Sequence, residues 1–426
     1  MKENIYRPLG ISDELFEKSE RILTELAGRF QQLDELREKN QLRVLQAFLH
    51  AGVTQASLVG TTGYGYDDLG RDALESIFAE LFESEAALVR HQFSSGTQVL
   101  TCCLRGLLRP GDELLIATGE VYDSLQGTLG RADDPEDLGS LRDFGISIRQ
   151  LDLDSEGKLK TAEILQALNA KTKLLYFQKS RGYSSRRTLL NAEIGEVLRL
   201  AKARKPELLV MVDNCYGELT EEHEPTSYGA DIAAGSLIKN LGAGIADSGA
   251  YVCGTEEAVR KVACQMSSPG LAGEIGPGLG QLRNLFRGLY FAPQVTNTAL
   301  KSALHAAALF AAEGYKVTPD SEQLRGDIVQ LIELGSREKL CAFCEEIQSA
   351  SPVDAGFTPV PAPMPGYDCD IIMASGSFVQ GSSIELSCDG PLRPPYRAYL
   401  QGGLSFAQSR LAQLRAAERL RSMESA

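Results

Sequence analysis

The strongest constraint on the fold of this chain is a series of short apolar runs between residues 86 and 214, separated by helical patterns. Strands are predicted at 86–92, 113–119, 172–178 and 207–214, and helices at 96–108, 161–169 and 191–205. The run LLVMVD, which ends at Asp213, is so apolar that it must be buried on both faces. This alternation predicts an α/β fold with a mainly parallel sheet between helices.

Helical patterns stand on either side of this region. Apolar residues recur about every 3.6 positions over residues 12–50, which predicts a helix. An alanine-rich helix at 298–315 is suited to joining two domains, and turns, strands and a closing helix at 405–422 follow it. We therefore expect three parts: an N-terminal helical segment at 1–60, a large domain at 61–290 and a smaller α+β domain at 291–426.

The charge balance narrows the classes of partner. Lysine and arginine total 43 against 57 aspartates and glutamates, which gives a formal net charge of -14, and no basic run interrupts this acidity. The composition therefore argues against nucleic acid and anionic membranes as partners. The N-terminus lacks an apolar signal region, and no apolar run is long enough to span a bilayer.

The cysteines indicate a reducing compartment. There are nine of them, an odd number at irregular spacings, which is not a disulfide framework. Cys341 and Cys344 form a single CxxC within an amphipathic stretch, where we expect buried structural thiols. Free thiols are typical of the cytoplasm, and we expect a cytoplasmic protein.

The common nucleotide-binding and hydrolase motifs are missing. The sequence contains no GxGxxG after a strand, no GxxxxGK(S/T) and no GxSxG. Its four histidines neither show HExxH spacing nor pair with the cysteines, so no metal site is expected.

Two charged residues stand out by their surroundings. Asp213 ends the apolar strand, at the edge of the sheet where α/β proteins bind ligands. Lys239 follows the small and apolar residues 234–238 and precedes a glycine-rich stretch, an environment that lowers the pKa of a lysine and favours imine chemistry. Each also has an ordinary explanation: Asp213 could cap the next loop, and Lys239 could be a surface lysine.

Further candidates lie near predicted strand ends. Ser95, Gly96 and Thr97 open a predicted helix, whose free N–H groups and dipole attract an anion. A plain helix cap would look similar. Ser236, three residues before the lysine, offers another hydroxyl. The aromatic side chain of Tyr122 could stack on the flat ring of a ligand; the alternative is that Tyr122 is an ordinary half-buried tyrosine.

Together these residues meet the four requirements of one cofactor, pyridoxal 5′-phosphate (PLP). Its aldehyde needs a lysine, its ring nitrogen a carboxylate, its phosphate a cup of donors and its ring an aromatic cover. The sequence therefore predicts a PLP-dependent enzyme.

In order and spacing, the chain resembles fold-type-I PLP enzymes of the cystathionine/methionine γ-lyase group, and more narrowly their bacterial methionine γ-lyase-like or "aluminium resistance" branch. The resemblance runs from GYGYDDLGRDALE through SSGTQVL, VDNCYGEL and GSLIKNLGAGIADSG to ELSCDGPLRPPY and YLQGGLSF. It implies a fold-type-I, transferase-like architecture with a sheet of the seven-stranded type.

The resemblance also implies a role for each candidate in the cofactor site. Lys239 would be the Schiff-base lysine and the proton shuttle, Asp213 the partner of the pyridinium, and Tyr122 the stacking residue. The phosphate cup would consist of Ser95, Gly96, Thr97 and Ser236.

One loop points to an oligomer. Tyr66 sits where the group places a tyrosine that reaches into the neighbouring subunit's active site. The resemblance therefore implies a homodimer or homotetramer in which the loop Tyr64–Arg71 completes the partner's site.

Two positions depart from the pattern of the group. Asp68 stands where the better-known lyases carry an arginine, and Glu385 replaces the arginine that binds the substrate carboxylate. Arg393, in the loop GPLRPPY, is our candidate for that second role, with Arg397 next. These departures leave the natural substrate open, and with it the choice between β and γ elimination.

Three functions are compatible with the sequence. The leading one is a carbon–sulfur lyase acting on a sulfur-containing amino acid. The second is an aminotransferase or another PLP reaction on the same fold. The third is a non-catalytic PLP-binding protein, against which the lysine and aspartate argue because a binding-only protein has little need of an electron sink.

Overall fold

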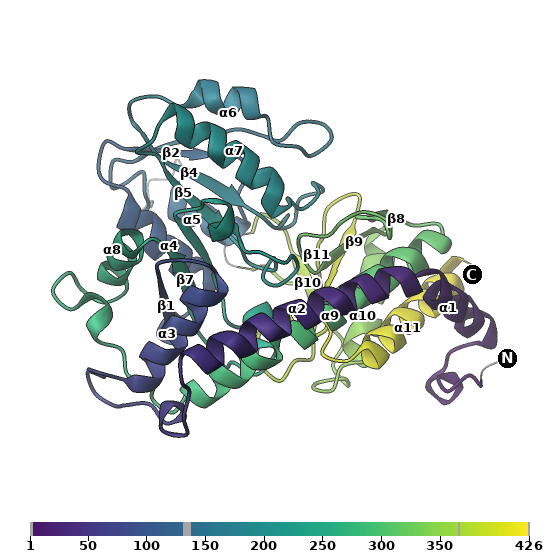
Figure 1. The fold of residues 1–426 in the computed structure, drawn as a ribbon. Helices are drawn as coiled ribbons and strands as arrows, with labels where there is room; N and C mark the ends of the chain where they lie inside the picture. The colour runs from purple at the N-terminus through teal and green to yellow at the C-terminus, as the bar shows by residue number, and fades with distance from the viewer. Residues whose placement is uncertain (1–2, 131–137, 365–366, 425–426) are drawn as a thin grey trace.

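The computed structural model describes residues 3–130, 138–364 and 367–424. Its larger domain is built on a seven-stranded sheet with the strand order β1-β7-β6-β5-β4-β2-β3 (Figure 1). In that order the strands are β1 (Ala86–Arg90), β7 (Ala250–Gly254), β6 (Ile232–Ser236), β5 (Leu209–Asp213), β4 (Thr172–Gln178), β2 (Glu113–Ile116) and β3 (Ser147–Gln150). The five strands from β6 to β3 are parallel, and β7 is antiparallel to both of its neighbours. The predicted mainly parallel α/β sheet is confirmed.

Helices cover both faces of this sheet. One face packs against α4 (Gly96–Leu107), α5 (Asp123–Leu129) and α8 (Glu256–Met266). The other face packs against α3 (Leu69–Leu81), α6 (Thr161–Ala167) and α7 (Asn191–Arg204). Since the sheet is covered on both sides, Val210, Met211 and Val212 in the central strand are all 0% exposed.

The smaller domain carries an antiparallel sheet with the order β10-β11-β12-β9-β8. In that order its strands are β10 (Ile371–Ser375), β11 (Ser387–Pro391), β12 (Arg397–Gln401), β9 (Val329–Glu333) and β8 (Lys316–Thr318). The helices α10 (Arg337–Ser349) and α11 (Phe406–Glu424) pack against it around one apolar core. A smaller α+β unit was predicted for this part of the chain.

Two helices link the two domains, and a third packs against the small one. The long helix α9 (Leu282–Ala312) contributes its first turns to the core of the large domain and its last turns to that of the small one. Helix α2 (Ala27–His50) runs alongside it (Figure 1), and α1 (Asp13–Glu25) packs against the small domain.

Two predicted helix boundaries are wrong. The single helix predicted at 12–50 is divided at Leu26, where the backbone (φ -78°, ψ -4°) turns and the side chain packs into the small-domain core. Helix α9 begins at Leu282 rather than 298, although Pro293, a residue that usually ends a helix, lies inside it. The domain boundary expected at 290 therefore falls within this helix.

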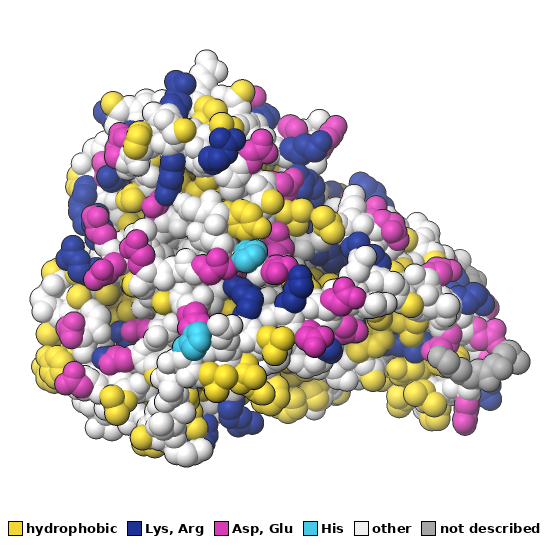
Figure 2. All heavy atoms as spheres, viewed as in Figure 1, with side chains coloured by type: hydrophobic (Ala, Val, Ile, Leu, Met, Phe, Trp, Pro, Cys, Tyr) yellow, Lys and Arg dark blue, Asp and Glu magenta, His cyan; other side chains and the backbone are white. Residues whose placement is uncertain are grey.

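The surface mixes both signs of charge. On the face drawn in Figure 2, acidic and basic side chains are interspersed, and hydrophobic side chains gather along the edge where α2 and α9 run. The exposed apolar residues of these helices include Leu42, Leu45 and Leu49 in α2 and Tyr290 and Phe291 in α9. Within the described ranges, no helix has the length and apolar character needed to cross a bilayer.

All nine cysteines are free thiols. Cys344 is buried, as predicted, and its sulfur lies 3.9 Å from that of Cys388. Cys341 is only partly buried, so the prediction of a buried thiol is wrong there. The reason is its position on α10, where the helix turns it toward the margin of the core.

Candidate active site

A cavity of about 350 Å³ lies between the two sheets. The carboxyl ends of β4, β5 and β6 and the start of α4 form one side, and strands β10, β11 and β12 form the other. The structure brings seven residues predicted from the sequence together in its lining: Ser95, Gly96, Thr97, Tyr122, Asp213, Ser236 and Lys239.

Asp213 is the last residue of β5 and is 5% exposed. Its Oδ1 accepts a hydrogen bond from the backbone N–H of Cys215 (3.1 Å), and its Oδ2 accepts one from the hydroxyl of Tyr176 (3.4 Å). Burial raises the pKa of this carboxyl, whereas the charge of Lys239 acts in the opposite direction. A buried carboxylate at the end of a parallel strand is suited to holding a cationic ring N–H.

Lys239 lies at the start of a short turn directly after β6. Its Nζ is 3.8 Å from the centre of the Tyr216 ring. The next residue, Asn240, fixes this arrangement because its Nδ2 donates to the carbonyls of Tyr216 (3.0 Å) and Glu218 (2.9 Å).

The pKa of Lys239 differs from the expectation. Burial by itself lowers the pKa of the ammonium, but the acidic groups of Cys215, Tyr216 and Asp213 outweigh burial and raise the pKa above its ordinary value. The lowered pKa expected from the apolar sequence context is therefore wrong for this arrangement, because the neighbours that stabilise the cation are distant in sequence.

The N-terminus of α4 faces the same cavity. Ser95 caps the helix, with its Oγ accepting from the backbone N–H of Gln98 (3.0 Å). The N–H groups of Gly96 and Thr97 open the helix, where no intrahelical acceptor exists. A Cβ added at Gly96 would lie 3.4 Å from the Cβ of Ser236, so the two arms of the predicted phosphate cup are adjacent.

Tyr122 precedes α5 and is held at both ends. Its backbone N–H donates to Oε1 of Gln178 (2.7 Å), and its hydroxyl is 2.6 Å from that of Tyr367 in the small domain. Burial, followed by the neighbouring Tyr367, raises the pKa of the phenol, so it remains protonated at neutral pH.

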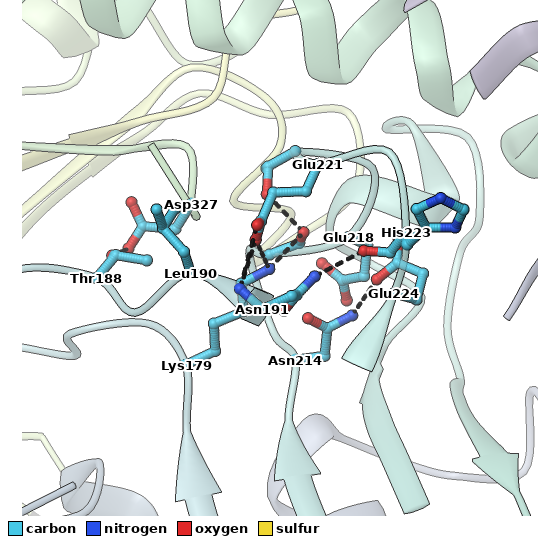
Figure 3. Close-up of polar contacts among 12 residues, drawn as sticks. Lys179, Thr188, Leu190, Asn191, Asn214, Glu218, Glu221, His223, Glu224 and Asp327 are labelled. Carbon is cyan, nitrogen blue, oxygen red and sulfur yellow. Dashed lines mark hydrogen bonds and ion pairs between the residues drawn. The ribbon is translucent and has the colours of Figure 1, made fainter. Parts of the chain in front are cut away.

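A network of polar side chains fixes the position of residues 214–224, the segment that follows β5 (Figure 3). Nζ of Lys179 pairs with Glu221 at 2.8 Å, and the backbone N–H of Asn191 donates to the same carboxylate at 3.1 Å. Nδ2 of Asn214 donates to Oε2 of Glu224 at 2.7 Å. These contacts tie residues 214–224 to β4 and α7, which positions the tyrosine ring beside Lys239.

Glu218 is a second buried acid in this turn. It is 0% exposed, and Tyr251 donates to its Oε1 (3.1 Å). Burial raises its pKa to about 8, so the carboxyl carries its proton at neutral pH.

Two other predicted residues lie away from the cavity of the single chain. Tyr66 is 53% exposed and stacks on Tyr64, with ring centroids 5.6 Å apart. Arg393 pairs with Asp368 (3.1 Å), and its side chain is 45% exposed. Neither Tyr66 nor Arg393 is part of the cavity lining.

Glu385, one departure from the group's pattern, supports the cavity wall. It accepts hydrogen bonds from the backbone N–H groups of Phe378 (2.9 Å) and Val379 (3.0 Å). The loop held in this way contributes Gly381 and Ser383 to the lining.

Asp68, the other departure, caps a helix. Its side chain accepts from the first N–H groups of α3 and from the N–H groups of Thr61 (2.9 Å) and Gly278 (2.8 Å). Arg397, the second carboxylate candidate, lies 3.5 Å from Glu333.

The cavity also contains residues that sequence reasoning missed. They are Gln178, Tyr183, Tyr216, Tyr367, Tyr399, Asp389 and Gln401. Tyr216 had a signal, because it follows Asp213 by three residues at the same strand end. Asp389 had a weaker signal, because it is a charged residue among the small and apolar residues of SCDGP.

The arrangement fits PLP on its geometry alone. One cavity combines a buried carboxylate at a strand end, a partly buried lysine, a helix N-terminus with free N–H groups and a partly buried phenol ring. Asp213 would hold the ring nitrogen, the start of α4 and Ser236 the phosphate, Tyr122 the ring and Lys239 the aldehyde carbon.

Known proteins share this architecture. The sequence model of the methionine gamma-lyase family matches residues 15–421. An uncharacterised protein of Bacillus subtilis is 46% identical over 383 residues, which cover 90% of this chain and 91% of that protein. The L-methionine gamma-lyase of Pseudomonas putida is 25% identical over 207 residues, 48% of this chain and 46% of that enzyme.

A solved structure is similar over the full length. The crystal structure of a carbon-sulfur lyase involved in aluminum resistance from Clostridium novyi NT is 39% identical, covers 98% of this chain and 99% of that one, and has a TM-score of 0.94. Because the family model matches almost all residues and the solved structure is similar over the full length, the chain belongs to the methionine gamma-lyase family of PLP-dependent, fold-type-I enzymes.

Proposed function

We propose that this protein is a carbon–sulfur lyase that removes a thiol from the β or γ carbon of a sulfur-containing amino acid. The observation that carries the proposal is the convergence of Lys239 and Asp213 on one cavity beside a free helix N-terminus. The similar enzymes of Clostridium novyi and Pseudomonas putida, a carbon-sulfur lyase and a methionine gamma-lyase, support this reaction class.

Each residue has one task in the proposed reaction. Bound PLP supplies an electron sink for the bonds at the substrate's Cα. Asp213 would hold a proton on the ring nitrogen, because its own burial makes an unpartnered negative charge costly. Lys239 would take the Cα proton and return it to a neighbouring atom, since its Nζ lies over Tyr216 inside the cavity.

Substrate orientation needs a group for the α-carboxylate. We propose Arg393, whose planar guanidinium can form two parallel hydrogen bonds with a carboxylate. Its present partner Asp368 is exposed, so exchanging that contact for a substrate carboxylate would cost little.

The proposed active unit is a homodimer or a dimer of dimers in the cytoplasm. The exposed loop of Tyr64 and Tyr66 would complete the partner's site, and its two solvent-exposed rings support this role. The free state of all nine cysteines supports a reducing compartment. We retain the three proposed parts 1–60, 61–290 and 291–426, with α9 as the helix between the last two.

The test combines a labelling experiment with an activity panel. Borohydride should fix PLP to the peptide that contains Lys239, and Lys239→Ala should abolish that label. The purified protein, supplied with a panel of sulfur amino acids, should release thiol, ammonia and keto acid in equal amounts. Transfer of the amino group without thiol release would replace the lyase proposal with an aminotransferase, and a label that persists in Lys239→Ala would refute the assigned lysine.

A further inference from the structure

The side chains that line the cavity include more acidic groups than basic groups. Among its described lining residues are two carboxylates, Asp213 and Asp389, and one basic side chain, Lys239. The reaction proposed above uses Asp213 and Lys239. Asp389 has no part in it, although it occupies the small-domain side of the same cavity.

Asp389 is buried without a cationic partner. It lies in the middle of β11 and is 8% exposed. Nε2 of Gln401 donates to its Oδ2 (3.0 Å), and Tyr183 provides a second hydrogen bond. Within the described ranges no lysine, arginine or histidine forms an ion pair with it, and Lys239 acts on it only from beyond ion-pair distance. Burying a carboxylate under these conditions is costly, and a bound cation would reduce that cost.

Tyrosine rings surround the same place. The centroid of Tyr183 is 5.1 Å from that of Tyr399 and 5.6 Å from that of Tyr367, and all three residues line the cavity. Aromatic faces attract organic cations, and several faces around one carboxylate form the kind of site that binds an ammonium group.

We propose that Asp389, together with Tyr183, Tyr367 and Tyr399, forms a subsite for an organic cation carried by the side chain of the substrate. The preferred substrate is then an amino acid whose thiol leaving group bears an ammonium group. This inference rests on the proposed lyase function, and it assigns Asp389 as a residue that determines specificity and takes no part in bond cleavage.

Two thioether amino acids of nearly equal size test the subsite with the PLP-loaded enzyme. S-(2-aminoethyl)-L-cysteine ends in an ammonium group where S-propyl-L-cysteine ends in a methyl group, and their homocysteine homologues serve for γ elimination. The wild-type enzyme should favour the cationic compound by about 10- to 100-fold in kcat/KM, the range of one charge-assisted hydrogen bond. Asp389→Asn should remove most of this preference through KM for the cationic compound.

The matched control is Asp370→Asn, which makes the same change at an exposed residue just before β10. It should keep the preference of the wild type. An unchanged KM for the neutral compound in Asp389→Asn shows that the cavity has kept its shape, and Asp389→Glu should restore part of the preference.

Calorimetry with L-lysine and L-norleucine separates the two proposals, since neither ligand has a sulfur leaving group. Tighter binding of L-lysine that depends on Asp389 supports the subsite even if no thioether is cleaved, an outcome that would refute the lyase. Equal kcat/KM for the two thioethers in the wild type, or a preference that survives in Asp389→Asn, overturns the subsite and leaves the lyase standing.

Discussion

The side chains with the clearest chemical roles depend on partners that are remote in sequence. Asp213 is held by the hydroxyl of Tyr176, and Lys239 lies against Tyr216 in a turn that Asn240 anchors. Their protonation follows from the same contacts, because burial raises the pKa of the aspartate and the lysine's acidic neighbours outweigh its burial. At the residue scale, these contacts therefore shift the pKa of both groups before any ligand binds.

Asp213→Asn tests the role of the ring-nitrogen partner. The variant should still bind PLP, because the helix N-terminus, Ser236 and Lys239 remain. Turnover should fall by about 100- to 1000-fold, since a neutral amide stabilises a charged ring poorly. Visible absorbance reports cofactor binding and thiol release reports turnover. Activity close to that of the wild type would reject the role of Asp213.

Arg393→Lys tests carboxylate binding. A lysine keeps the charge but loses the two parallel hydrogen bonds, so KM for amino acids should rise about tenfold while PLP absorbance is unchanged. Arg397→Lys is the matched variant, and a rise in its KM alone would move the role to Arg397. If neither variant changes KM, another group holds the carboxylate.

At the scale of elements, the turn that joins β5 to the following 3-10 helix is as important as the strands. It contains two buried carboxyl groups, Glu218 and Glu224, and both have a pKa raised by burial. The ion pair between Lys179 and Glu221 ties it to β4 (Figure 3). Tyr216 belongs to this turn, so its position depends on contacts made by residues that do not line the cavity.

Glu218→Gln should change how stability depends on pH. The pKa of Glu218 rises from 4.5 to about 8 on folding, so the folded state holds a proton that the unfolded state releases between these values. Stability therefore falls with rising pH across this window, by up to about 1.4 kcal/mol per pH unit. Because glutamine cannot ionise, the variant should gain stability relative to wild type from about pH 5 to 8. Urea unfolding at several pH values measures the difference, and Glu207→Gln, at an exposed position, should show none.

At the scale of the whole molecule, the site exists only where two domains meet. The large domain supplies Asp213, Lys239 and the start of α4, and the small one supplies Asp389 and Tyr367. Helices α2 and α9 join the two cores, and their exposed apolar edge is suited to contact with a second copy of the chain (Figure 2).

Mixing two inactive variants tests whether Tyr66 acts in a neighbouring subunit. Tyr66→Ala and Lys239→Ala should each have little activity alone. In randomly mixed dimers, one site of each heterodimer would combine an intact Tyr66 from one subunit with an intact Lys239 from the other. Activity should then return to roughly one quarter of the wild-type value, since about half of the dimers are mixed and each has one intact site. Sedimentation should show a multiple of the 46.1 kDa chain mass. No recovery in mixtures shown to exchange subunits would place Tyr66 outside the partner's site.

The sequence by itself determined the α/β sheet, the small α+β unit and seven of the residues that line the cavity. Periodic burial and strand ends are local properties, and the lining residues Asp213, Lys239, Ser95 and Tyr122 all lie at or beside them. Only the tertiary structure decided the raised pKa of Lys239, the exposed position of Arg393 and the place of Asp389 in the cavity. These properties depend on groups that are distant along the chain and adjacent only after folding, and a one-dimensional pattern carries no information about such distances.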